Sequence, residues 1–389
     1  MKILLDIETF ILPLQQKFKQ ATSRNLIDTL RESVVKSNNM PKNSQSAGKI
    51  VRVTPQAAIA GGEVFIECEN VPVQPGSEIR CYFNNVASSL IAASPQRIIA
   101  IIPDDELELL NGDTEVRLVC DEQSTKNNYK IKTSHKLADD LHLVANPAVD
   151  PDDDRLIVTR SGSRGQQLPV TLFRLSLDGS LEEISGDIMN PTGIAFNMSG
   201  EMFVTSRAEG TVYRVNGADE SVPFASDMGT ATGIAFNQNG EMFVGDRAGT
   251  IYKVNAVGET QIFATLEQSI AAYHLAFGRD GALYVTRPNV ASFDSIMKID
   301  ADGEVSIFYR GLGRPQGLAF DREGNLYVAA CLRQRRGIIR ITPDGREAEL
   351  FVAGMNIVGL CFGRNGEMFI ATNDSIFSLQ LGIYGTLLS

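Results

Sequence analysis

Apolar runs and turn residues alternate along residues 137–389 in a pattern that returns about every 40 residues. Each copy contains the phrase G-[IL]-A-F or a variant, a turn glycine, a second apolar run such as M-F-V or L-Y-V, and a third such as T-V-Y-R-V. Short runs of this composition indicate β-strands, and the glycines supply the positive φ that tight hairpins need. The phrase starts at Gly193, Gly233, His274, Gly317 and Gly359.

A weaker copy begins at Asn146, which brings the number of copies to six. A four-stranded sheet of this kind cannot bury both faces alone, whereas sheets stacked around an axis bury their faces against one another. We therefore predict a six-bladed β-propeller over residues 137–389. The last copy lacks an obvious fourth strand, and we expect residues 137–144 to supply it and close the ring, which removes an exposed sheet edge.

Residues 49–133 contain shorter β-rich runs, among them V-F-I-E-C and R-I-I-A-I-I-P, separated by the turn signals A-G-G-E, Q-P-G-S and N-G-D. This spacing predicts a small antiparallel sandwich. The polar and basic residues 124–138 are expected to link the sandwich to the propeller.

Residues 1–36 have apolar positions at helical spacing, and the polar residues 37–48 have the composition of a flexible linker. Two interpretations remain open, because so short a segment cannot build a core alone. The helices pack on their own chain, or the apolar side docks onto a partner protein. The expected docking residues are Leu4, Leu5, Ile7, Phe10, Ile11, Leu14 and Phe18.

The fold class predicted for the whole chain is therefore mainly β: a short helical segment, a sandwich and a propeller. A formal net charge of −11 argues against general nucleic-acid binding, which needs a basic face. No apolar run is long enough for a transmembrane helix. Asp6 and Glu8 interrupt the apolar start, so we expect no signal peptide and a cytoplasmic location. The five cysteines lack metal-site spacing and are expected to be buried. A disulfide between two of the first three, Cys68, Cys81 and Cys120, remains possible if the protein is exported.

Both β regions resemble known families. In the first region the matching positions are Pro55, Gly61, Gly62, Val64, Phe65, Ile66, Tyr82, Phe83, Asn84, Ile99, Ile101, Ile102, Pro103 and Gly112. With these residues it is similar to the IPT/TIG family, an immunoglobulin-like fold, and this resemblance implies an immunoglobulin-like sandwich that acts as a spacer or protein-binding module. The propeller region, with its repeated G-[IL]-A-F phrase, resembles NHL-type propellers and the SMP-30/gluconolactonase-like group, whose lactonases hold a divalent metal at the axis.

The metal ligands of the SMP-30 pattern are missing. Where that group carries the asparagine of a P-N-G phrase, this chain has Thr192, Thr232, Tyr273, Gln316 and Val358, and its first copy offers no glutamate. A hard cation needs several oxygen ligands. We therefore predict no metal and no cofactor. The alternative is a lactone hydrolase with divergent ligands, which would need a divalent metal such as calcium.

Four arginines follow the second strand of successive copies, in the phrases V-T-R, V-T-S-R, V-G-D-R and V-T-R: Arg160, Arg207, Arg247 and Arg287. Equivalent positions in a propeller lie on one face, so these side chains should gather there. Guanidinium groups suit carboxylates and phosphates, and we predict an anionic ligand or an acidic partner segment at this mouth. The competing interpretation pairs each arginine with an acid such as Asp246, Asp294 or Asp374.

The other predicted mouth residues are Thr192, Thr232, Tyr273, Gln316 and His274. His274 lies on an inner strand, where a lone histidine is either packed or a general base. No catalytic triad can be assembled. We favour a non-catalytic binding or scaffolding protein with a protein partner or a small anionic ligand. The lactonase is the alternative. A sugar-binding protein is a third interpretation, for which only tyrosines such as Tyr213 and Tyr252 could stack on a ring.

Overall fold

The computed structural model describes residues 48–104, 111–162, 166, 168–184, 188–216, 220–289 and 293–386. The chain divides into two compact units, Met1–Ser46 and Ala47–Ser389. The predicted helical segment, its docking residues and nearly all of the linker lie outside the described residues. The described part is all β, and a membrane-spanning helix is absent from it.

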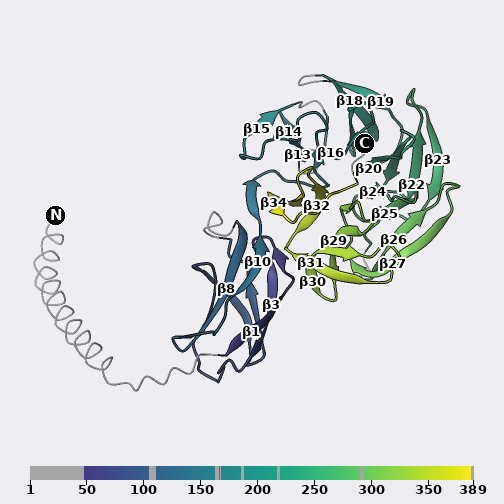
Figure 1. Ribbon diagram of the computed structural model, residues 1–389. Helices are drawn as coiled ribbons and strands as arrows, with labels where there is room; N and C mark the ends of the chain where they lie inside the picture. Colours follow the sequence, from purple (N-terminus) through teal and green to yellow (C-terminus); the bar gives the residue numbers. More distant parts are fainter. Residues whose placement is uncertain are drawn as a thin grey trace, which may run out of the picture. The chain divides into compact units, whose positions relative to one another are not determined.

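Within the described residues, six four-stranded antiparallel units follow one another around a common centre, as in a β-propeller (Figure 1). Their strands are β12 (Ala148–Val149), β13 (Leu156–Thr159), β14 (Leu172–Leu175) and β15 (Leu181–Glu183); β16 (Pro191–Phe196), β17 (Met202–Ser206), β18 (Thr211–Asn216) and β19 (Glu220–Ala225); β20 (Ala231–Phe236), β21 (Met242–Asp246), β22 (Thr250–Val254) and β23 (Thr260–Thr265); β24 (His274–Phe277), β25 (Leu283–Thr286), β26 (Asp294–Ile299) and β27 (Val305–Gly313); β28 (Leu318–Phe320), β29 (Leu326–Leu332), β30 (Arg335–Ile341) and β31 (Ala348–Ala353); β32 (Ile357–Phe362), β33 (Glu367–Thr372), β34 (Ile376–Gln380) and β11 (His135–Ala138).

The last blade is completed by β11, which comes from the opposite end of the propeller sequence and pairs with β34. This closing strand overlaps only the beginning of the predicted residues 137–144. The remainder of that segment still contacts the blade, because the Leu141 and Leu143 amides donate to the carbonyls of Asp374 and Asn373 at 3.0 and 2.9 Å. Main-chain hydrogen bonds between the beginning and the end of the propeller sequence therefore close the ring.

Aromatic side chains hold successive blades together. In four neighbouring blades, the aromatic residue of the second strand contacts one ring on the outer strand of its own blade and one ring on the inner strand of the next, always edge to face. The phenylalanine that ends the G-[IL]-A-F phrase therefore packs between blades. The groups are Phe203 with Phe224 and Phe236, Phe243 with Phe263 and Phe277, Tyr284 with Phe308 and Phe320, and Tyr327 with Phe351 and Phe362.

The described residues from 48 to 133 form two sheets, which we call the two-sheet domain, and their buried apolar residues belong to one core that continues into the fourth and fifth blades of the propeller. Alternate residues of β3 are buried, as the sequence pattern requires for a strand with one face on the core. Cys68, Cys81 and Cys120 are buried in this core as free thiols. One sheet is β1 (Lys49–Thr54), β3 (Glu63–Glu69), β7 (Arg97–Ile101) and β6 (Leu90–Ala93); the other is β2 (Ala57–Ala58), β10 (Tyr129–Thr133), β8 (Gly112–Cys120), β4 (Ile79–Phe83) and β5 (Val86–Ser88), with β9 (Gln123–Ser124) beside β8.

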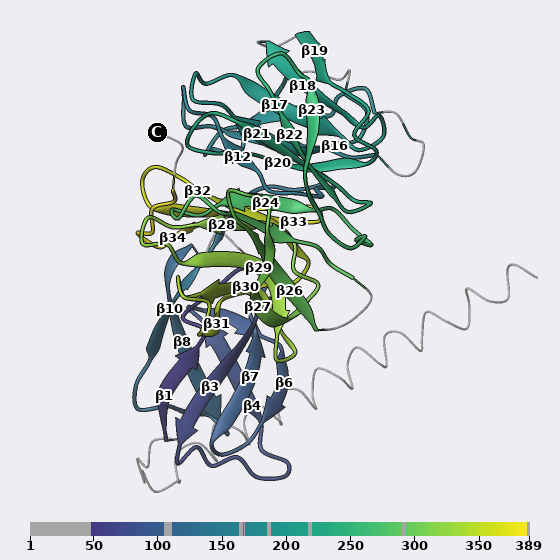
Figure 2. The same ribbon diagram turned by 90° about the vertical axis from the view of Figure 1, so that its right-hand side faces the viewer.

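The two-sheet domain is joined to the propeller by main-chain pairing. Strand β2 pairs in parallel with β10 on one side and with β31, the outer strand of the fifth blade, on the other. Figure 2 shows β10 and β31 close to each other at this junction. The Ile59 amide extends this junction by donating to the Ala353 carbonyl at 2.9 Å. Strands β10 and β11 occupy most of residues 124–138, the segment expected to link the two parts, and the pairing of β2 with β31 is a second connection between them.

Arg335 anchors the same junction from the propeller side. Its guanidinium lies 3.9 Å from the centre of the Phe65 ring and donates to the Thr54 carbonyl at 2.8 Å. Burial lowers the pKa of Arg335, and the Glu63 carboxylate partly offsets this. A guanidinium stacked on an aromatic face and hydrogen-bonded to a carbonyl fixes both the distance and the angle between the two parts.

Replacing Arg335 with alanine is expected to lower the free energy of unfolding by about 2 kcal/mol, since one stacked cation and one charge-assisted hydrogen bond are lost. Urea unfolding followed by far-ultraviolet circular dichroism measures the change. Arg346→Ala, at a side chain that is 84% exposed, is the matched control and is expected to change stability by less than about 0.5 kcal/mol. Equal effects of the two substitutions would refute the anchoring role.

Candidate functional site

The four predicted arginines each stand directly after the second strand of a blade: Arg160 after β13, Arg207 after β17, Arg247 after β21 and Arg287 after β25. Equivalent strands of a propeller run in the same sense, so these four residues are placed on the same face of the ring. We call this surface the arginine face. Its members differ in burial, because Arg247 is exposed while the other three are half-buried.

Arg207 and Arg247 lie close enough to repel each other. Burial is the main cause that lowers the pKa of the Arg207 guanidinium, and the positive charge of Arg247 lowers it further. Among the described residues, neither of these arginines nor Arg160 has an ion-pair partner. Two neighbouring cations without a carboxylate between them repel each other, and a bound anion would relieve that repulsion.

The acids that could have paired with the arginines have other partners. Asp246 accepts hydrogen bonds from the Thr230 and Ala248 amides at 2.9 and 3.0 Å, and Asp374 accepts one from the Thr372 hydroxyl at 2.8 Å. These carboxylates therefore stabilise the turns of their own blades. They do not neutralise the arginine face.

Arg287 is the member of the face that does form an ion pair. It contacts Glu267 at 2.9 Å, and only 15% of its side chain is exposed against 81% for Glu267. Asp294 lies near enough for the Arg287 charge to lower its pKa, but burial raises the pKa of this carboxyl more strongly. Arg287 is therefore partly neutralised, and the positive charge is concentrated around Arg207 and Arg247.

Of the predicted mouth residues, Thr192, Thr232, Tyr273 and His274 are buried, whereas Gln316 is half-buried. The Thr205 hydroxyl donates to the Thr232 carbonyl at 2.7 Å, and the Thr232 hydroxyl accepts from the Tyr273 amide at 3.0 Å. The Thr286 hydroxyl donates to the Gln316 carbonyl at 2.7 Å. Thr192 is fully buried as well. Thr232, Tyr273 and Gln316 thus take part in hydrogen bonds between adjacent blades, and the structure does not bring the predicted mouth residues together with the arginines as one open surface.

His274 occupies the position that is glycine in most copies, and it is only 5% exposed. Burial lowers the pKa of its imidazole to about 4, so the ring is neutral at physiological pH. An enclosed imidazole with so low a pKa is a weak base. His274 is therefore a packed residue of the blade interior.

Sequence reasoning missed two kinds of residue that organise this region. The threonines Thr205 and Thr286 make the interblade hydrogen bonds, although they stand in the same V-T-S-R and V-T-R phrases that pointed to the arginines. Asn146 was noted only as the start of a weak copy. Its side chain donates to the Leu318 carbonyl at 3.0 Å and accepts from the Leu360 amide at 3.1 Å, and it thereby connects three blades.

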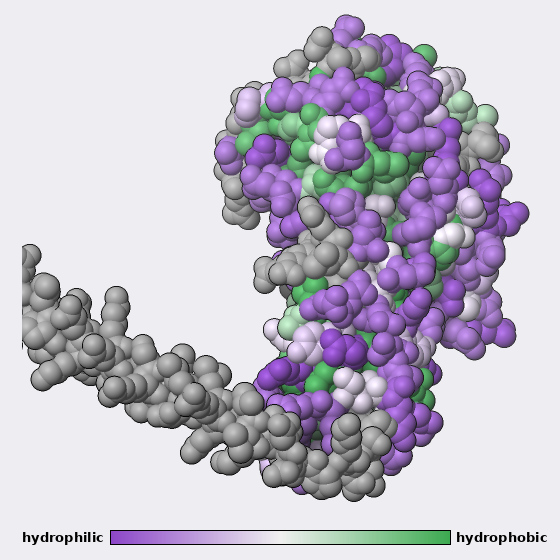
Figure 3. Space-filling model, turned by 60° about the vertical axis from the view of Figure 1, so that its left-hand side comes forward, coloured by the Kyte–Doolittle hydropathy of each residue, from purple (hydrophilic) through white to green (hydrophobic). Residues whose placement is uncertain are grey.

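In the residues that the structure describes, no group of three or more histidine, cysteine, aspartate or glutamate side chains is placed to hold a metal ion. The surface of the side shown in Figure 3 is mostly hydrophilic, with hydrophobic residues exposed in separate patches.

No known protein-family model matches this sequence, and no curated protein matches it either. Solved structures do share its fold. A gluconolactonase from Xanthomonas campestris has a TM-score of 0.52 at 16% identity, over 63% of this chain and 88% of that one. A protein of unknown function from Bacteroides thetaiotaomicron has a TM-score of 0.51 at 13% identity, over 88% of this chain and 100% of that one. An auxiliary nutrient binding protein from Bacteroides thetaiotaomicron has a TM-score of 0.50 at 14% identity, over 87% and 99% of the two chains. At these identities the similarity shows the fold alone.

Proposed function

We propose that this protein is a non-catalytic binding protein that holds an anionic ligand on its arginine face. The observation that carries the proposal is that the exposed Arg247 lies near enough to the half-buried Arg207 for its charge to add to the lowering of the Arg207 pKa by burial, while neither arginine forms an ion pair among the described residues. A ligand carboxylate or phosphate would replace that repulsion by attraction, and the planar guanidinium groups offer it paired donors.

The proposed organisation around this face has three parts. Residues 49–133 form an IPT/TIG-like module, and the strand orders β1-β3-β7-β6 and β10-β8-β4-β5 around one core support an immunoglobulin-like assignment. Residues 137–389 form an NHL- or SMP-30-like propeller. Residues 1–36 are proposed to dock onto a protein partner, with residues 37–48 as the linker, so that the chain also acts as a scaffold.

The lactone hydrolase is the less favoured alternative. The positions that would hold a catalytic metal carry Thr192, Thr232 and Tyr273, and the last two are used in hydrogen bonds between blades. His274, the one histidine of an inner strand, has a strongly lowered pKa and is enclosed. No contact in the described residues favours hydrolysis over binding.

The double substitution of Arg207 and Arg247 by glutamine separates a binding role from a structural one. With inorganic phosphate as the probe, calorimetric titration of the wild-type protein is expected to show saturable binding, and the double variant is expected to bind at least about tenfold more weakly. Without phosphate, the variant is expected to be as stable as the wild type or slightly more stable, because a repulsion between like charges is removed.

Arg346→Gln is the control for loss of positive charge at an exposed site and is expected to leave phosphate binding unchanged. The proposal fails if the double variant loses stability while its phosphate affinity is retained. It also fails if the purified protein contains a stoichiometric divalent metal and added metal raises its melting temperature, since that result identifies a metal site.

A further inference from the structure

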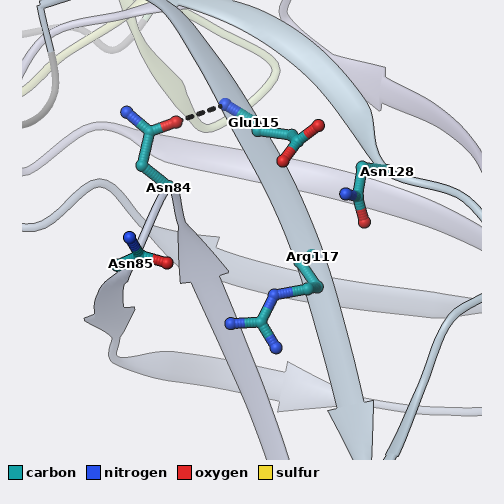
Figure 4. Close-up of a pocket in the computed structure, with 5 residues that line it drawn as sticks. All are labelled: Asn84, Asn85, Glu115, Arg117 and Asn128. Carbon is teal, nitrogen blue, oxygen red and sulfur yellow. Dashed lines mark hydrogen bonds between the residues drawn. The ribbon is translucent and has the colours of Figure 1, made fainter.

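A hollow of about 420 Å³ opens on the two-sheet domain, lined by Asn84, Asn85, Glu115, Arg117 and Asn128 (Figure 4). Glu115 and Arg117 alternate along β8 with Val116 and Leu118, which are 0% and 1% exposed in the core. The two charged side chains therefore project from the opposite, outer face of the sheet. The hollow shares no residue with the arginine face.

The backbone around the hollow is held in place. Asn84, in the turn between β4 and β5, donates its amide to the Glu115 carbonyl at 2.7 Å, and its side-chain oxygen accepts from the Glu115 amide at 2.9 Å. Asn84 has a positive φ of 50°, which asparagine tolerates better than most residues. The turn that carries Asn85 is thus attached to the strand that carries both charges.

The guanidinium of Arg117 is also positioned, because it stacks on the Tyr82 ring at 4.5 Å from its centre. Stacking uses the flat face of the group and leaves its N–H donors at the edge available. Among the described residues, Arg117 forms no ion pair, and neither does Glu115, although the two are only two positions apart on the same side of β8.

The charges have separate surroundings. In Figure 4 the Arg117 guanidinium points towards the side of Asn85, whereas the Glu115 carboxylate points towards the side of Asn128. The hollow therefore has a positive end and a negative end, each with a side-chain amide nearby. An anion alone or a cation alone would leave one of the two charges without a partner.

We propose that this hollow binds a small zwitterion, a free α-amino acid with a polar side chain. The ligand carboxylate accepts hydrogen bonds from Arg117 and Asn85, and its ammonium group donates to Glu115 and Asn128. All five lining residues carry polar or charged side chains, so a polar ligand side chain can form hydrogen bonds there that an apolar one cannot. The hollow is at the lower end of the range of small-molecule sites, which suits a ligand of amino-acid size.

Calorimetric titration of the full chain with L-glutamine tests the proposal. N-acetyl-L-glutamine removes the positive charge of the probe and the α-amide of L-glutamine removes its negative charge, and each is expected to bind at least about tenfold more weakly. L-leucine, a zwitterion of similar size with an apolar side chain, is expected to bind more weakly than L-glutamine. Equal affinity for the three charge forms would overturn the zwitterion assignment.

Variants locate the site. Glu115→Gln and Arg117→Gln are each expected to weaken L-glutamine binding at least about tenfold, and Glu115→Gln is expected to abolish the preference over N-acetyl-L-glutamine. Glu122→Gln, at an exposed residue outside the hollow, is the matched control and is expected to have no effect. Absence of saturable L-glutamine binding at millimolar concentrations, or binding that both hollow variants retain, would show that the hollow is not this site.

Discussion

Replacing Gly359 with alanine is expected to destabilise the protein by about 3 kcal/mol, because an added methyl group would force backbone apart where the ring closes. The new Cβ would lie 2.6 Å from both the amide nitrogen and the Cα of Asn146 and 2.7 Å from the Ala145 carbonyl carbon. Backbone atoms cannot rotate away as a flexible side chain can. The Asn146 side chain also accepts from the Leu360 amide, so the same displacement weakens that hydrogen bond.

Equilibrium urea unfolding of the wild type and the variant measures this loss. Gly281→Asn is the matched control, since its Cβ would meet nothing within 4 Å and its φ of +76° is one that asparagine adopts. We expect the control to cost less than about 1 kcal/mol. A loss of the same size in both variants would show that the close approach of the first and last blades is not the cause.

Acid is expected to destabilise the protein through His274 by up to about 3 kcal/mol as the pH falls from about 6.5 to 4. Burial lowers the pKa of this histidine from the ordinary value of 6.5 to about 4 in the folded state. Between these two pH values the unfolded chain binds a proton that the folded protein does not. The contribution of His274 to the free energy of unfolding is therefore fully present above pH 6.5 and is lost progressively below it. A difference of about 2.5 units at about 1.4 kcal/mol per unit sets the size of the effect.

The difference between wild type and His274→Gln isolates this contribution from that of the carboxylates. The free energy of unfolding of the wild type is expected to fall more steeply between pH 7 and pH 4.5 than that of the variant, whatever the variant's stability at neutral pH. His142→Gln, at an exposed histidine, is the control and should follow the wild-type profile. Parallel profiles of wild type and His274→Gln would contradict the assignment of acid sensitivity to this buried ring.

The propeller could be predicted from the sequence because its contacts are local and repeated. Each blade pairs strands that follow one another along the chain, so the period of the G-[IL]-A-F phrase is the period of the structure. For the same reason Arg160, Arg207, Arg247 and Arg287 could be placed on one face from their alignment alone. The closing strand was found only approximately, since β11 pairs with a partner at the far end of the chain.

The burial of the predicted mouth residues could not be foreseen. Thr232, Tyr273 and His274 align with metal-ligand or glycine positions, but only the packing of inner strands against one another shows that they are covered. Whether each arginine has an acidic partner also depends on side-chain directions. Asp246 ends the strand that Arg247 directly follows, and its carboxylate nevertheless accepts hydrogen bonds from the Thr230 and Ala248 amides of its own blade.

The sequence by itself determined the β class of the two described regions, the repeat of the blades and the common face of the four arginines, because these follow from periodicity within and between neighbouring strands. Only the tertiary structure decided the sheet that joins Ala57–Ala58 to Val352 and Ala353, the stacking of Arg335 on Phe65, and the nearness of Arg207 to Arg247, neither of which forms an ion pair within the described residues. These depend on residues brought together from distant parts of the chain, and their contact energies leave no periodic signal in the order of the amino acids.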